Sequence, residues 1–102
     1  MYQPAYQNEQ TDLLVRALLS LNTPEEMYRF LDDVLTVQEM QSIAQRVHVA
    51  QLLRKGGTYQ EISHETGAST TTVTRVNRSL RYGAEGYAAA LDRVLGDNGG
   101  NE

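Results

Sequence analysis

The apolar residues of this 102-residue chain recur at helical spacing and fall into six segments, each bounded by a capping signal or a glycine. No segment shows the alternation of apolar and polar residues that is typical of a strand, so the predicted fold class is all-α. The predicted helices cover residues 11–21, 24–35, 37–55, 58–67, 68–82 and 85–95.

Three of the helix starts carry the Thr-x-x-Glu spacing of a capping box. In such a box the threonine and glutamate side chains accept hydrogen bonds from backbone N–H groups of the first turn. The pairs are Thr23 with Glu26, Thr36 with Glu39, and Thr58 with Glu61. Pro24 strengthens the first pair, because proline suits the first helical position.

The first predicted helix is apolar on nearly every side, which is unusual for a helix at the surface of a small protein. Its residues 13–15 and 17–19 are all apolar. Such a helix lies deep in a core or is covered by another subunit, and the second arrangement is more economical in so short a chain. In the third helix, the predicted inner stripe consists of Met40, Ile43, Val47, Ala50 and Leu53.

The stretch from Thr58 to Leu80 has the pattern of a helix-turn-helix. Gly67 supplies the left-handed residue that ends its first helix, and Ser69 is placed to cap the second. Ile62 and Ala68 are predicted to be buried. Val73, Val76 and Leu80 recur at helical spacing and form one buried stripe.

The opposite face of the second of these helices is predicted to contact DNA. Residues 70–72 are three consecutive threonines, which are poor helix formers, so helix stability does not explain them. Threonine can touch thymine methyls or donate to base and phosphate oxygens, and arginine supplies bidentate donors. The predicted groove residues are Thr70, Thr71, Thr74, Arg75 and Arg78, and the predicted phosphate contacts are Tyr59, Gln60 and Ser63. The alternative is an ordinary helical hairpin with a solvated cationic face.

The charge distribution supports a polyanionic partner although the net charge is −4. Residues 45–82 carry six of the nine Lys and Arg residues against two Glu, whereas both flanking regions are acidic. Phosphate binding requires a local basic face rather than a basic protein.

The remaining composition bounds the class of protein. We expect an N-terminal arm over residues 1–10, a single helical domain over 11–95 with the helix-turn-helix at 58–82, and a disordered tail over 96–102. The chain has no cysteine, and no apolar run is long enough to span a bilayer. The polar start of the chain lacks a signal-peptide pattern, so a cytoplasmic location is the default expectation.

Neither a metal site nor an active site is predicted. His48 and His64 are the only histidines, and they lack metal-ligand spacing. No catalytic constellation is recognisable, so we do not expect an enzyme. Tyr82 and Tyr87 are interpreted as packing residues or as residues at the edge of an interface, rather than as platforms on which bases stack.

Residues 35–95 resemble the tryptophan-repressor family, specifically its YerC/YecD-like branch. The motifs that carry the resemblance are Leu35-Thr36 with Glu39, Gln45-Arg46-Val47, Leu52-Leu53-Arg54, Gly67-Ala68, Thr72-Val73-Thr74-Arg75 and Ser79-Leu80. The resemblance implies a six-helix protomer in an intertwined homodimer. Two-fold symmetry in turn implies a pseudo-palindromic DNA site with half-sites about one turn apart.

The resemblance also implies a candidate effector pocket, because Arg46, Arg75 and Ser79 match residues that hold tryptophan in the repressors. This chain departs from their pattern at Val76, where the repressors have a glycine beside the indole. A branched side chain there would fill the pocket, so we do not expect tryptophan as effector and predict no cofactor.

The leading functional hypothesis is therefore a sequence-specific DNA-binding transcriptional regulator that reads the major groove of double-stranded DNA as a two-fold dimer. The alternative is a helix-turn-helix protein–protein interaction module without specific DNA binding, because a fold does not determine a function.

Overall fold

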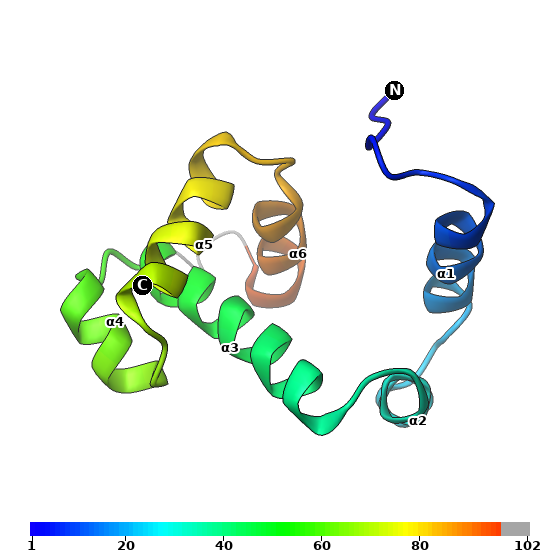
Figure 1. The fold of residues 1–102 in the computed structure, drawn as a ribbon, viewed down its shortest axis with the longest axis horizontal. Coiled ribbons are helices and arrows are strands. Elements are labelled where there is room, and N and C mark those ends of the chain that lie inside the picture. Colours follow the sequence, from blue (N-terminus) through cyan, green and yellow to red (C-terminus); the bar gives the residue numbers. More distant parts are fainter. Residues whose placement is uncertain (97–102) are drawn as a thin grey trace. The chain divides into compact units, whose positions relative to one another are not determined.

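The computed structural model describes residues 1–96, and these residues form six helices and no strand (Figure 1). The helices are α1 (Glu9–Leu19), α2 (Pro24–Val34), α3 (Val37–Arg54), α4 (Tyr59–Thr66), α5 (Thr70–Tyr82) and α6 (Gly86–Leu95). The all-α fold class and the order of the helices are as predicted. All but one residue of the predicted tail over 96–102 lies outside the described residues.

The chain divides into two compact units, Met1–Gln38 and a second unit that begins at Glu39. A single domain over residues 11–95 stays a prediction. The N-terminal arm is two residues shorter than expected, because α1 begins at Glu9 rather than at Thr11. Asn8 caps this helix by accepting from the Thr11 N–H, and the Thr11 hydroxyl oxygen accepts in return from the Asn8 N–H.

Local capping chemistry forms the ends of the helix-turn-helix largely as its sequence predicts. The Thr58 hydroxyl oxygen accepts from the Glu61 N–H, and the Glu61 carboxylate accepts from the Thr58 N–H. Ser69 caps α5 in the same way, with Thr72 as the donor. Gly67 ends α4 at φ +78°, a left-handed conformation in which a Cβ atom would be strained.

Of the two hydrogen bonds in the capping box predicted for α2, one is found and the other has a different donor. The Thr23 hydroxyl oxygen accepts from the Glu26 N–H, which confirms the cap. The Glu26 carboxylate, however, accepts from the N–H of Asn22, not from that of Thr23. The carboxylate thus satisfies a donor one residue before the cap, which sequence spacing alone does not distinguish from the standard arrangement.

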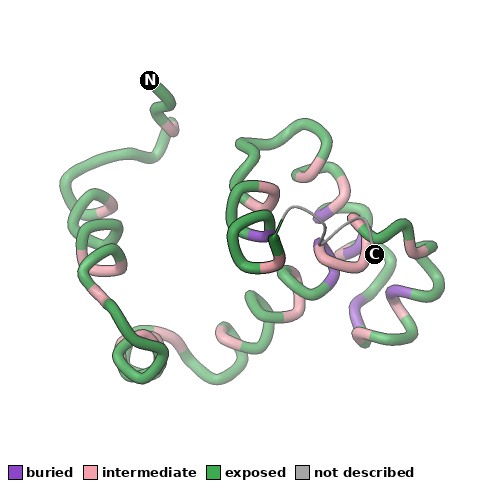
Figure 2. The backbone as a smooth tube through the Cα atoms, turned by 180° about the vertical axis from the view of Figure 1, so that it is seen from behind, coloured by how far each residue is buried: buried purple, intermediate pink, exposed green. Residues whose placement is uncertain are grey.

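The hydrophobic core of the second unit lies where α4 and α5 pack together and where α3 and α6 meet them (Figure 2). Its buried members are Val49, Ala50, Ile62, Ala68, Val73, Val76 and Leu91. Leu80 and Tyr87 are half-buried against them. The predicted burial of Ile62, Ala68, Val73 and Val76 is confirmed, whereas Leu80, predicted in the same buried stripe, is only half-buried.

The inner stripe predicted for α3 is wrong in part. Ala50 is buried as expected, and Leu53 packs against the core. Ile43 and Val47, in contrast, are each 42% exposed, and Val49 is fully buried in their place. The apolar residues of α3 lie on several of its sides, so the spacing of the helix did not identify a unique inner face.

The first unit buries almost nothing within the chain. Neither α1 nor α2 contains a buried residue, and Leu13 and Leu19 are 60% and 77% exposed. Within residues 1–96, no helix has both the length and the apolar content needed to cross a bilayer.

The capping box of α4 makes part of the stability of the fold dependent on pH. The hydrogen bonds from Thr58 hold the pKa of Glu61 below its ordinary value. A carboxylate whose pKa is lowered by folding stabilises the folded state at any pH above its ordinary pKa, and the contribution is lost as the pH falls through the lowered pKa of the folded state.

We therefore expect Glu61→Gln, which keeps an acceptor oxygen but has no charge, to lower the urea midpoint at pH 7 and to approach the wild-type midpoint at pH 3. Glu85→Gln is the matched control, because Glu85 makes no side-chain capping hydrogen bond at the start of α6. A difference between wild type and Glu61→Gln that is the same at both pH values would contradict the role assigned to this charge.

Candidate nucleic-acid interface

The turn between α4 and α5 is held by short-range hydrogen bonds on both sides of Gly67. The Ser63 hydroxyl donates to the Ala68 carbonyl, which ties α4 directly to the first residue after the glycine. The Thr66 hydroxyl donates to the Ile62 carbonyl and accepts from the Ala68 N–H. These bonds restrain the turn, so the side-chain hydroxyls of α4 help to hold the angle between the two helices.

Two side chains of α3 also fasten the end of α4. The Gln45 amide donates to the Thr66 carbonyl over 3.2 Å, and it approaches the turn at Gly67. One turn further along α3, His48 Nε2 lies 3.9 Å from the Glu65 carboxylate. The end of α4 therefore contacts α3 through polar side chains as well as through the hydrophobic core.

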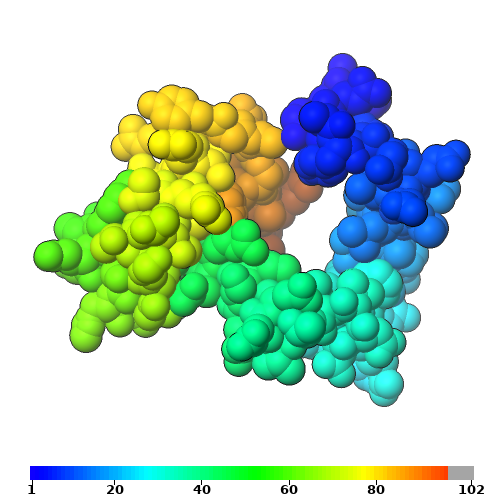
Figure 3. All heavy atoms as spheres, viewed as in Figure 1, coloured from blue at the N-terminus to red at the C-terminus, as the bar shows by residue number. Residues whose placement is uncertain are grey.

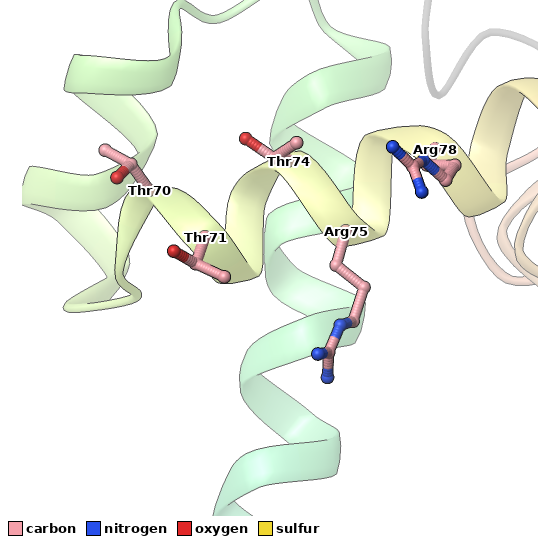
Figure 4. A pocket seen from close by; sticks show the side chains of 5 residues that line it. All are labelled: Thr70, Thr71, Thr74, Arg75 and Arg78. Carbon is pink, nitrogen blue, oxygen red and sulfur yellow. The ribbon is translucent and has the colours of Figure 1, made fainter.

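The burial of Val73 and Val76 turns the opposite face of α5 outward. That face forms an open hollow of about 330 Å³, and the five residues that line it are Thr70, Thr71, Thr74, Arg75 and Arg78. Figure 4 looks onto this face, with Thr70 and Thr74 along one edge, Thr71 and Arg75 along the other, and Arg78 between them. The five groove residues proposed from the sequence thus lie on a single surface.

The two arginines of this surface are available to a ligand. Neither Arg75 nor Arg78 forms an ion pair or a side-chain hydrogen bond with any residue in 1–96. Arg54 differs from them, because its guanidinium pairs with Asp92 of α6. Of the six basic residues in 45–82, Arg54 is thus ion-paired within the described chain, and three of the other five, Arg75, Arg78 and Arg81, lie on α5.

The residues of α4 proposed as phosphate contacts differ in their surroundings. Tyr59 and Gln60 are exposed in the first turn of α4. Figure 3 shows that the surfaces of α4 and α5 adjoin. Ser63 is half-buried, and its hydroxyl proton is already donated to Ala68. Because a phosphate oxygen only accepts, Ser63 would have to break this hydrogen bond to contact one.

Two residues of the candidate effector pocket, Arg75 and Ser79, line different hollows. Arg75 belongs to the hollow on the outer face of α5. Ser79 belongs to a different and mainly apolar hollow of about 410 Å³, together with Val47, Tyr87 and Leu91. Arg46 lines neither of these, and its Nε donates to the Ser42 carbonyl one turn earlier in α3. Val76 is only 1% exposed and packs in the core.

Sequence reasoning missed the contacts between segments that hold this surface in place. Gln45 with Thr66 joins residues 21 positions apart, and Arg54 with Asp92 joins residues 38 positions apart. No local pattern distinguishes these side chains from other exposed polar residues of a helix. In the described part of the chain, no group of three or more His, Asp or Glu residues is placed to hold a metal ion.

Comparisons with known proteins agree with the geometry. Residues 9–95 match the family described as Trp repressor protein. The chain is 54% identical to the uncharacterized protein YerC of Bacillus subtilis (strain 168), over 84% of this chain and 83% of that protein.

Two solved structures are similar to this chain over 86% of its length, each with a TM-score of 0.83. One is a TrpR-like protein from Eubacterium eligens ATCC 27750, which is 44% identical and covered over 91% of its chain. The other is a candidate Trp repressor from Staphylococcus aureus, which is 45% identical and covered over 88%. The predicted resemblance, including its YerC branch, is confirmed.

Proposed function

The chain belongs to the Trp repressor protein family, and on that premise we propose that it is a sequence-specific DNA-binding transcriptional regulator. The observation that carries the proposal is the outer face of α5, where three threonines and two unpaired arginines line one open hollow. Because the Trp repressor family is a family of regulators and no catalytic constellation is recognisable, we do not propose an enzymatic activity.

The mechanism we propose is insertion of α5 into the major groove. Threonine methyls and hydroxyls in its first turn suit thymine methyls and base-edge acceptors. The Arg78 guanidinium lies directly opposite the buried stripe, so it would point to the floor of the groove and could donate in bidentate fashion to a guanine. Tyr59 and Gln60 in the first turn of α4 would contact phosphates and set the register of the helix.

We also propose that the working form is a homodimer. A helix with no buried residue gains little tertiary stabilisation, and isolated helices of this length are marginal in water. The apolar residues of α1 therefore need a covering surface, and a second copy of the chain supplies one. A two-fold dimer would place two copies of α5 on a pseudo-palindromic site.

For the dimer, sedimentation equilibrium should give a mass of about twice 11.4 kDa. Leu13→Glu should shift the protein toward monomer, because it places a charge on the apolar face of α1. Gln10→Glu adds the same charge to an exposed polar position of α1 and should leave the mass unchanged. A wild-type protein that sediments as a monomer at micromolar concentration would argue against this assembly.

We further propose that tryptophan is not the effector. Val76 of α5 fills space in the core, and Arg75 and Ser79 line two different hollows. Calorimetric titration with L-tryptophan should give no binding heat at micromolar ligand, and the DNA affinity should not change when tryptophan is added. Saturable heat at micromolar ligand would refute this.

For DNA recognition, Arg78→Ala should cost about 1–3 kcal/mol of binding free energy on the preferred site and relax specificity at one base position. The preferred site is first obtained by selection from a random duplex library. Arg93→Ala is the matched control, since Arg93 is exposed on α6 and has no partner among the described residues.

Three results of this experiment separate the possibilities. If Arg78→Ala lowers the binding free energy equally on every DNA sequence, Arg78 is a phosphate contact. If Arg78→Ala and Arg93→Ala lower it equally, the effect is a general one of charge and not a contact of Arg78. A selection that enriches no sequence, together with capture of one stoichiometric protein partner, would favour the protein-interaction module instead.

A further inference from the structure

Tyr82 is a large aromatic side chain that the described part of the chain leaves exposed. It is the last residue of α5, and 81% of it is exposed. Tyr87, in contrast, is half-buried against the core. In residues 1–96, the Tyr82 hydroxyl has no hydrogen-bond partner. An exposed tyrosine alone needs no explanation, but this one lies at the end of the helix that carries Arg75 and Arg78.

The position of Tyr82 continues the outer face of α5. Thr71, Arg75, Arg78 and Tyr82 are spaced by four, three and four residues, which places them in one row along a helix. This row lies opposite the buried Val73 and Val76. Tyr82 therefore extends the surface of the hollow by one turn beyond Arg78.

The row is longer than the major groove is wide, so its two ends would meet different parts of the DNA. Tyr82 lies eleven residues after Thr71, which corresponds to about 16 Å along the helix axis. The major groove is about 12 Å wide and 8.5 Å deep. When the first turn of the helix reaches the bases, a side chain 16 Å further along lies outside the groove, at the level of the phosphates.

We propose that Tyr82 is a phosphate contact, with its phenol O–H donating to a backbone oxygen at the rim of the groove. Tyrosine is among the side chains that make such contacts, and with only two side-chain torsions it loses little entropy when it is held. The end of the helix supports this use, because the Gly83 N–H donates to the Ser79 carbonyl and keeps the last turn regular. This inference rests on the proposed DNA-binding function.

The test compares Tyr82→Phe with Tyr28→Phe, which removes the hydroxyl of a tyrosine that is 67% exposed on α2. Binding is measured on the selected site and on a pool of random-sequence duplexes, as a function of salt. Tyr82→Phe should lower the affinity for the selected site and for the random-sequence pool by the same factor, about three- to tenfold. The reason is that a phosphate contact carries no sequence information. The dependence of log affinity on log salt should not change, because no charge is removed.

Arg81→Gln provides the electrostatic comparison on the adjacent residue. If Arg81 contacts a phosphate, its loss should reduce the salt slope by about one, which Tyr82→Phe should not do. Sedimentation of Tyr82→Phe should match wild type, which excludes a loss of binding caused by weaker assembly.

The outcomes distinguish this inference from the function on which it rests. Wild-type affinity for Tyr82→Phe on both DNAs would overturn the assignment while DNA binding stands. A loss confined to the selected site would also overturn it, since Tyr82 would then read a base. A wild-type protein that binds neither DNA would overturn the proposed function, and the role of Tyr82 with it.

Discussion

The packing of Val73 and Val76 against Ile62, Ala68 and the buried residues of α3 is the constraint on which the rest of the second unit depends. Each residue of a helix is rotated by about 100° from the previous one, so burying positions 73 and 76 leaves no choice about which side of α5 faces outward. Thr71, Thr74 and Arg78 are exposed because of this packing, and not because of any interaction of their own.

Polar contacts, in addition to the core, hold the angle between α4 and α5. The left-handed Gly67 sets the direction of the chain, and the Ser63 and Thr66 hydroxyls hold the residues on either side of it. Gln45 then fixes the end of α4 from α3. Because the turn is restrained in this way, a ligand of the outer face of α5 would not have to supply the cost of ordering this helix.

The sequence was most informative where structure is local. The cap at Thr58, the turn at Gly67 and the cap at Ser69 each depend on residues within four positions of one another, and each is found as predicted. The same holds for the outer face of α5, which follows from the periodicity of one helix. The inner side of α3 was not predictable in this way, because its apolar residues lie on several sides and the neighbouring helices decide which are buried. The pairs Gln45 with Thr66 and Arg54 with Asp92 are also set by tertiary packing alone.

At position 76, a side chain that packs in the core and open space for a ligand exclude each other. Val76 is part of the packing that orients the outer face, and it directly follows Arg75 of that face. The tryptophan-binding repressors that the chain resembles have a glycine here, which leaves space for an indole. In this chain a glycine would cost about 1 kcal/mol in helix propensity alone, and the lost core packing would add to that. A glycine at this position would therefore open space for a ligand only at the expense of the packing that orients the outer face of α5.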